Sequence, residues 1–304
     1  MKQESEQRQW HSAHQEPQNA ISGSPRSTLF VMAEEHAPAV VFEDVSLAFD
    51  DHVVLDKVSF IVPKGRMTII LGASGSGKSV ALKLILGLLK PDTGKILVNG
   101  HRIDRMSEYE LLQMRADVGM LFQETALFDS LSVAENVGYR LSEEMRLPQD
   151  EVDARVLETL GFVGLTEYGD RRTTELSGGQ RRRVAMARAM ASRPSVLLLD
   201  DPTTGLDPIT ATSVDDEIVK LRDLQEVTSI VVTHQIRDAV YVATHKAVQR
   251  NGKISIEETV VDGERVQFLM LREGRIHFVG TQEELLANPD AYLKEFLYMT
   301  LPPW

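Results

Sequence analysis

The glycine-rich loop Gly72–Ser79 constrains the fold of this chain more than any other segment. Its residues, Gly72, Ala73, Ser74, Gly75, Ser76, Gly77, Lys78 and Ser79, fit the pattern G-x-x-x-x-G-K-[ST]. The glycines let the backbone fold around a phosphate group without clashes from Cβ atoms, and the N–H groups at the start of the next helix face the anion. Lys78 is placed to reach the β- and γ-phosphates, and the Ser79 hydroxyl to bind Mg²⁺. The loop therefore predicts a nucleotide-phosphate site.

The segments around this loop predict an α/β fold. Met67–Leu71 is short, apolar and β-branched, as a buried parallel strand is. The apolar residues from Ala81 to Leu89 recur at helical spacing. Val196–Leu199 and Ser229–Val232 are expected to be further buried strands. Strands are also expected at 39–42 and 58–62, and helices over most of 130–192.

Two adjacent carboxylates follow the strand predicted at Val196–Leu199. A carboxylate at the carboxyl end of an apolar strand is the expected Mg²⁺ position in a nucleotide-binding sheet, so Asp200 is the candidate metal ligand. Asp201 is the candidate for polarising the attacking water. His234 follows the strand Ser229–Val232 of the same predicted sheet, at the edge where ligands bind.

A second anion-binding pattern lies at Ser177-Gly178-Gly179-Gln180, where a serine and two glycines begin a predicted helix. The arginine run Arg181–Arg183 follows it directly. By itself such a run predicts a solvated helix face more often than a nucleic-acid site.

Together these motifs resemble the ATPase subunits of ABC transporters, in that family's motif order, over residues 39–285. The resemblance implies a P-loop NTPase (RecA-like) core with an antiparallel β subdomain and an inserted α-helical subdomain at about 124–180. It also implies ATP and Mg²⁺ as ligands, and two copies of the chain that sandwich ATP between Gly72–Ser79 of one copy and Ser177–Gln180 of the other.

The resemblance also assigns a role to single residues of this chain. Gln123 would be the Q-loop glutamine, which serves catalysis and binds the metal together with Ser79 and Asp200. Asp207 would be the D-loop aspartate at the nucleotide, and Phe49 the aromatic that stacks on adenine. Ser177–Gln180 would be the signature motif, His234 the switch histidine and Lys78 a catalytic residue.

The chain departs from the family pattern in two places. The strand usually ends Asp-Glu, and here it ends Asp200-Asp201. Because Asp201 is one methylene shorter than glutamate, we expect hydrolysis that is retained but modest. An added β-hairpin is expected at about 250–266, where two turn signals separate alternating apolar residues. It is expected to be a surface elaboration.

Two segments narrow the resemblance. They are Ala126–Val137, which contains Leu127-Phe128-Asp129-Ser130, and Thr203–Thr210, which ends Asp207-Pro208-Ile209-Thr210. Together they resemble the ATPases of Mla-type phospholipid transporters, which work with an integral-membrane permease and Mce-domain lipid-binding proteins. The resemblance implies that the chain powers phospholipid transport between membranes of a bacterial envelope. It would lie in the cytoplasm, peripheral on the inner face of the cytoplasmic membrane.

Composition limits the partners. The net charge of −12 argues against sequence-independent nucleic-acid binding, which needs a basic face. The chain has no cysteine, which excludes disulfides and thiolate catalysis. No apolar stretch approaches the roughly 18 residues of a membrane span, so another chain would cross the membrane. Residues 1–38 predict a flexible polar tail, and residues 286–304 a C-terminal helical tail.

Other readings remain open at this point. The chain could serve another ABC importer that carries a small solute, because such ATPases have similar segments. It could be a soluble ABC ATPase of DNA repair or translation, although those chains carry a coiled coil or two tandem cassettes. A regulatory subunit that binds ATP with little turnover is a third possibility, which Asp201 keeps open.

Overall fold

The computed structural model describes residues 38–225, 227–259 and 265–300. The predicted polar tail lies outside these residues apart from Pro38, and so do residues 301–304 of the predicted C-terminal tail.

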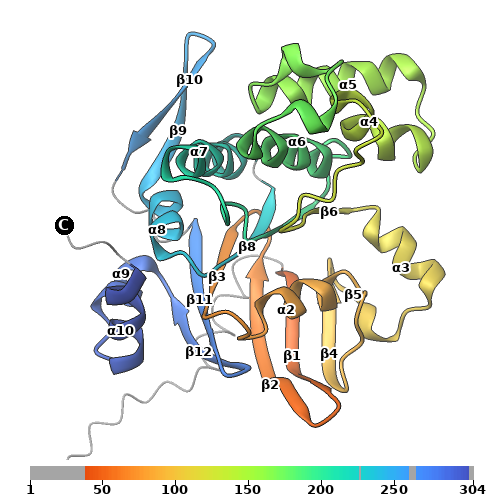
Figure 1. The fold of residues 1–304 in the computed structure, drawn as a ribbon. Helices are drawn as coiled ribbons and strands as arrows, with labels where there is room; N and C mark the ends of the chain where they lie inside the picture. The colour runs from red at the N-terminus through yellow and green to blue at the C-terminus, as the bar shows by residue number, and fades with distance from the viewer. Residues whose placement is uncertain (1–37, 226, 260–264, 301–304) are drawn as a thin grey trace, which may run out of the picture.

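A six-stranded sheet forms the centre of the molecule (Figure 1). Its order is β12-β11-β3-β8-β7-β6, in which neighbours from β11 to β6 pair in parallel and β12 pairs antiparallel with β11. Every residue of β3, β7 and β8 is buried, as expected for parallel strands covered on both faces. The strands are β3 Met67–Leu71, β6 Val118–Leu121, β7 Val196–Asp200, β8 Thr228–Thr233, β11 Val266–Arg272 and β12 Arg275–Gly280.

A second, antiparallel sheet covers one side of the parallel one. Its order is β2-β1-β4-β5. Phe42 and Phe60 stack at its centre, with ring centroids 4.4 Å apart, and pack into the same core as helix α2 and one face of the parallel sheet. The elements are β1 Pro38–Phe49, β2 His52–Pro63, β4 Thr93–Val98, β5 His101–Arg102 and α2 Lys78–Ile85.

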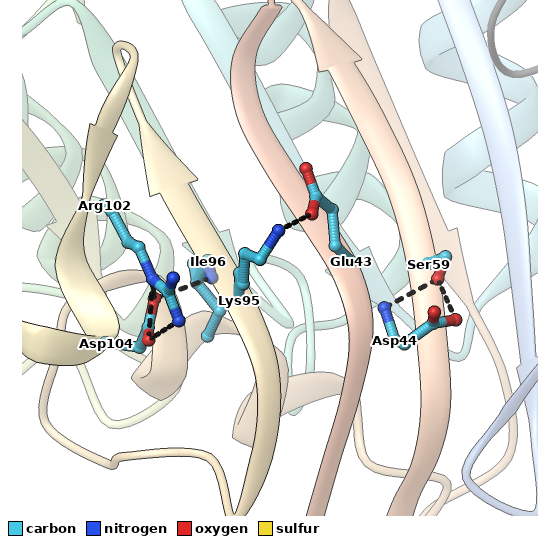
Figure 2. A network of polar contacts seen from close by, with 7 residues as sticks. All are labelled: Glu43, Asp44, Ser59, Lys95, Ile96, Arg102 and Asp104. Atoms are coloured by element: carbon cyan, nitrogen blue, oxygen red, sulfur yellow. Dashed lines mark hydrogen bonds and ion pairs between the residues drawn. The ribbon is translucent and has the colours of Figure 1, made fainter.

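Polar side chains fix the outer surface of this antiparallel sheet (Figure 2). Lys95 on β4 pairs with Glu43 on β1 at 2.9 Å, and Arg102 pairs with Asp104 at 2.9 Å. The backbone of β1 bulges at Asp44, which has φ 48° and donates its N–H to Ser59 Oγ at 2.8 Å. The Lys95–Glu43 and Asp44–Ser59 contacts each join neighbouring strands of this sheet.

Helices α6, α7 and α8 pack against the other face of the parallel sheet (Figure 1). They form one core with the C-terminal helices α9 and α10. Their bounds are α6 Gly178–Met190, α7 Pro208–Leu224, α8 Ile236–Thr244, α9 Gln282–Ala287 and α10 Ala291–Thr300.

A separate helical unit lies between β6 and α6. It has its own core, to which α6 also contributes Val184 and Ala187, while Ala185 and Met186 of α6 face the sheet. Helix α6 therefore joins the two cores. The unit contains α4 Val133–Glu143, α5 Gln149–Phe162 and the 3₁₀ turns η2 Thr166–Tyr168 and η3 Thr173–Glu175; η1 Ile103–Arg105 and α3 Glu108–Arg115 precede β6.

A two-stranded hairpin projects from the sheet region, next to α7 and α8 (Figure 1). Its strands are β9 His245–Arg250 and β10 Lys253–Glu258. Asn251 and Gly252 both have positive φ, 51° and 75°, which matches a tight two-residue turn. Because β9 starts at His245, the hairpin begins before the predicted range 250–266. Residues 260–264 of that range lie outside the described residues. Among the described helices, none has the length and apolar character needed to cross a bilayer.

Candidate active site

The glycine loop connects the carboxyl end of β3 to helix α2. Gly75 and Gly77 take φ of 80° and 100°, which favour glycine. A Cβ on Gly77 would also lie 2.7 Å from a methyl carbon of Leu55 on β2. A Cβ on Gly72 would lie 2.4 Å from the carbonyl oxygen of Leu271. The loop thus packs closely against both sheets at Gly72 and Gly77, where there is no room for a side chain.

Lys78 lies inside this loop and is 5% exposed. Its ammonium group donates to the carbonyl oxygens of Gly72 at 2.8 Å and Ala73 at 3.0 Å. Burial lowers the pKa of Lys78, and the nearby carboxylates of Asp201 and Asp200 oppose that shift. The Ser76 hydroxyl is buried and has no hydrogen-bond partner. An unpartnered hydroxyl beside a buried ammonium fits a phosphate group, which accepts hydrogen bonds from both.

Ser79 and Asp200 meet next to this loop. Ser79, on the first turn of α2, donates from Oγ to Oδ1 of Asp200 at 2.9 Å. Burial raises the pKa of Asp200, and the hydrogen bond from Ser79 lowers it. A hydroxyl and a carboxylate are hard oxygen donors of the kind that Mg²⁺ takes from proteins beside nucleotide phosphates. The pair fits that ion.

Asp201 and His234 form a second pair at the same edge of the sheet. They follow the neighbouring strands β7 and β8, and Nδ1 of His234 lies 2.9 Å from Oδ1 of Asp201. The Asp201 side chain is 12% exposed and that of His234 is 40% exposed. Asp201 also donates its backbone N–H to the carbonyl oxygen of Val232 at 2.8 Å. The structure thus brings together the candidate base, the candidate switch histidine and the glycine loop.

The Ser177–Gln180 segment forms the N-terminal cap of α6. Ser177 Oγ accepts from the Gln180 N–H at 3.3 Å, and Gln180 Oε1 accepts from the Ser177 N–H at 2.9 Å. Gly178 and Gly179 form the first turn, and a Cβ on Gly179 would lie 2.2 Å from Cγ2 of Thr210 on α7. Gly179 is therefore required by the packing of α6 on α7.

Asp207 caps helix α7. Its carboxylate accepts from the N–H groups of Ile209 and Thr210, each at 3.1 Å, and from the Thr210 hydroxyl at 2.5 Å. The hydrogen bond from Thr210 lowers the pKa of this carboxyl. Within the described residues these partners all lie in the first turn of α7, and no hydrogen bond joins Asp207 to the glycine loop. Its role at a nucleotide stays a prediction.

Gln123 follows β6 and is held through its backbone by Arg182. The Arg182 guanidinium is buried and donates to the carbonyl oxygens of Phe122 at 3.2 Å and Gln123 at 2.5 Å. It also donates to the carbonyl oxygen of Thr204 at 3.1 Å. The expectation of a solvated arginine face is therefore wrong for Arg182, which is buried and donates hydrogen bonds to backbone carbonyl oxygens of two loops. Sequence reasoning missed this residue as a link between the two loops.

Phe49 ends β1 and pairs with His52 across the turn to β2. Its ring is 45% exposed, which leaves it free to stack on a base. The adenine contact stays a prediction, as does the participation of Gln123 in metal binding.

The chain is similar to several known proteins. A family model described as ABC transporter matches residues 55–204. The phospholipid transport ATP-binding protein MlaF of Escherichia coli strain K12 is 35% identical over 266 residues, 88% of this chain and 91% of that protein. The sulfate/thiosulfate import ATP-binding protein CysA of Mycobacterium bovis is 41% identical over 71% of this chain and 60% of that protein.

A solved structure matches the fold. The ATP-binding cassette MJ0796, in a dimeric post-hydrolysis state bound to ADP and phosphate, superposes with a TM-score of 0.66 at 28% identity, over 80% of this chain and 98% of that one. The α/β fold is thus that of an ABC ATPase, as predicted. Because MlaF is similar over most of both chains and the family model matches residues 55–204, this chain belongs to the ABC transporter family as an ATP-binding subunit that hydrolyses ATP.

Proposed function

We propose that the chain is the ATP-hydrolysing subunit of an ABC transporter that moves phospholipids between membranes of a bacterial envelope through a separate permease. The observation that carries this proposal is the extent of its similarity to MlaF, 88% of this chain and 91% of that protein. The similarity to CysA has higher identity but reaches only 60% of that protein. A small-solute importer is the second candidate, and the 41% identity to CysA favours it.

The proposed reaction uses two copies of the chain in a head-to-tail dimer. ATP would lie between Gly72–Ser79 of one copy and Ser177–Gln180 of the other. The backbone N–H groups of the glycine loop and the Lys78 ammonium bind the phosphates, where their charge is worth most in an enclosed site. The ADP-bound dimer of MJ0796 supports this assembly.

Asp201 and His234 act on the attacking water in this proposal. Asp201 accepts a hydrogen bond from the water and takes its proton, and His234 orients the Asp201 carboxylate through Nδ1. Ser79, Asp200 and Gln123 would hold Mg²⁺, which neutralises charge on the phosphates.

The permease would bind beside the helical unit. Phe128 and Tyr139 are 41% and 39% exposed, and their ring centroids lie 4.7 Å apart. Tyr109 and Leu112, on α3, are 71% and 59% exposed. The exposed Phe128–Tyr139 pair is the apolar feature that supports a protein-binding surface on the helical unit in this proposal.

The loop that carries Phe128 is held in place by one buried amide. Asn136 is fully buried on α4; its Oδ1 accepts from the Phe128 N–H at 2.8 Å, and its Nδ2 donates to the carbonyl oxygens of Phe128 at 3.0 Å and Ser132 at 2.9 Å. This preorganisation lowers the entropy cost of binding a partner. The chain would then lie at the inner face of the cytoplasmic membrane, and an Mce-domain protein would join the same complex.

A pull-down of the tagged full chain from gently solubilised native membranes tests the proposal. Recovery of a polytopic permease, an Mce-domain protein and phospholipid is the expected result. A permease with a small-solute binding protein would favour the second candidate. Recovery with no membrane protein would contradict both.

A matched pair of variants then tests the docking surface. Phe128→Ala should reduce the recovered permease about tenfold, since one buried aromatic at an interface contributes about 1–2 kcal/mol or more. Leu157→Ala, which removes a 59% exposed side chain from α5, should leave recovery unchanged. Equal recovery with both variants would place the permease elsewhere.

A further inference from the structure

A small buried cavity lies behind the loop that joins β7 to α7. Its volume is about 10 Å³, close to that needed for a single water molecule. Pro202, Thr203, Asp215, Thr233 and Asp238 are among its lining residues. These residues come from the loop after Asp201, from α7, from the end of β8 and from α8. The cavity therefore lies where the elements that carry Asp201 and His234 meet.

Asp238 holds the loop side of this cavity to α8. The Thr203 hydroxyl donates to Oδ2 of Asp238, and the Arg237 guanidinium donates twice to Oδ1, at 2.8 Å and 2.7 Å. Thr203 is 1% exposed and Asp238 is 4% exposed. A buried carboxylate with three donors is well satisfied. Arg237 would still pair its charge if the Thr203 hydroxyl were removed, so that hydroxyl is available to hold the loop.

The Thr203–Asp238 hydrogen bond is a second link between the segments that carry Asp201 and His234. Thr203 lies two residues after Asp201, and Asp238 lies four residues after His234, in the first turn of α8. Asp201 and His234 touch directly at 2.9 Å. They are joined a second time through Thr203 and Asp238, and Gln235 Nε2 adds a hydrogen bond to the Thr203 hydroxyl at 3.4 Å.

We propose that Asp238 is a positioning residue for ATP hydrolysis, which through Thr203 fixes the loop that carries Asp201 against the helix that follows His234. A displacement of about 1 Å at a reacting group costs about 10²-fold in rate. A second link that keeps Asp201 and His234 in place would therefore raise the rate of hydrolysis. In this proposal Asp238 acts through the loop and not on the reacting atoms.

Asp215 completes the cavity from α7, the helix that Asp207 caps. It is 2% exposed, and its Oδ1 has no hydrogen-bond partner. Burial, with the charges of Asp238 and Asp216 added, raises the pKa of Asp215 to about 9, and Arg237 opposes this. Asp215 is therefore neutral at pH 7, which leaves one negative charge in the cavity for Thr203 and Arg237 to satisfy.

Two substitutions at Thr203 test the proposal in the full-length chain. Thr203→Val keeps the side-chain shape and removes the hydroxyl, whereas Thr203→Ser keeps the hydroxyl. We expect Thr203→Val to lower kcat for ATP hydrolysis about tenfold or more, with ATP affinity within about threefold of wild type. Thr203→Ser should keep kcat within about twofold. Asp238→Ala should match Thr203→Val, and combining the two should add little further loss.

Glu217→Gln is the matched control. Glu217 is buried on α7, has one unpartnered oxygen, and pairs with Lys220 of the same helix at 2.9 Å. Its kcat should equal that of wild type. The proposal is overturned if Thr203→Val hydrolyses ATP at the wild-type rate. It is equally overturned if Thr203→Val and Asp238→Ala lose ATP affinity and melting temperature along with kcat, because the contact would then serve packing alone.

Discussion

His234 Nδ1 and Asp201 Oδ1 lie 2.9 Å apart, at the ends of two neighbouring parallel strands. Because a carboxylate only accepts hydrogen bonds, Nδ1 carries the hydrogen in this contact, and Nε2 remains available to a ligand. Asp201 takes φ 44°, a left-handed conformation that Asp adopts more readily than most residues. The short side chain is thus held at the edge of the sheet by both its backbone and its carboxylate.

The Lys78 ammonium is predicted to supply much of the binding energy for the phosphates. Lys78→Ala removes a buried ammonium group, which now donates hydrogen bonds to the carbonyl oxygens of Gly72 and Ala73. ATP affinity should fall at least about tenfold, since a charge-assisted contact contributes about 1.5–3 kcal/mol. Equilibrium binding of a fluorescent ATP analogue measures this. Lys83→Ala, which removes an exposed lysine from the same helix, should bind as wild type does; equal affinity of the two variants would refute the assignment.

Position 179 is predicted to accept only glycine, because the Thr210 side chain lies too close for a Cβ atom. Gly179→Ala places a Cβ 2.2 Å from Thr210 Cγ2, so α6 and α7 must separate. Overpacking of this kind costs about 1–3 kcal/mol of folding free energy, measurable by urea unfolding. Adding Thr210→Ser removes that methyl group and keeps the hydroxyl bond to Asp207, so most of the stability should return. A double variant as unstable as Gly179→Ala would show that another contact excludes the side chain.

Asp215 predicts a pH dependence of stability. The folded chain keeps its proton up to about pH 9, whereas the unfolded chain releases it near the ordinary Asp pKa of about 4. Between about pH 5 and pH 9 the folded state therefore holds more protons, and the wild type loses stability as the pH rises. Asp215→Asn has no such titration.

The free energy of unfolding of Asp215→Asn, relative to wild type, should therefore rise by about 1.4 kcal/mol for each pH unit in that window. Urea unfolding at several pH values measures the difference. Asp150→Asn removes an exposed carboxylate and controls for the change in charge. A difference that stays constant with pH would mean that Asp215 is not neutral in the folded chain.

The meeting of the glycine loop, Asp200 and His234 could be predicted from the sequence because each is marked by a local pattern. Gly72–Ser79, Asp200 and His234 each follow a recognisable apolar strand, and carboxyl ends of adjacent parallel strands meet at one edge. Their meeting there follows from the order β3-β8-β7. The helical unit could also be expected, since its capping serines and apolar spacing are sequence features.

The residues that sequence reasoning missed are those whose partners are distant backbone groups. Arg182 binds carbonyl oxygens of residues 122, 123 and 204, and Asn136 binds a loop eight residues away. A carbonyl is present at every position, so no pattern marks it as a partner. Asp215 and Asp238 look like ordinary polar residues of amphipathic helices. Only the packing of α7 on α8 brings them to one cavity.

The assignment of Asp201 as the general base in place of a glutamate is tested most directly by one measurement. The ATP turnover rate of Asp201→Asn is compared with that of wild type in the purified full-length chain, with ATP affinity measured in parallel. The account predicts a fall in kcat of about 10²–10⁴-fold with affinity retained, because general-base help is lost and the binding loop is not touched. Turnover by Asp201→Asn at the wild-type rate would contradict it.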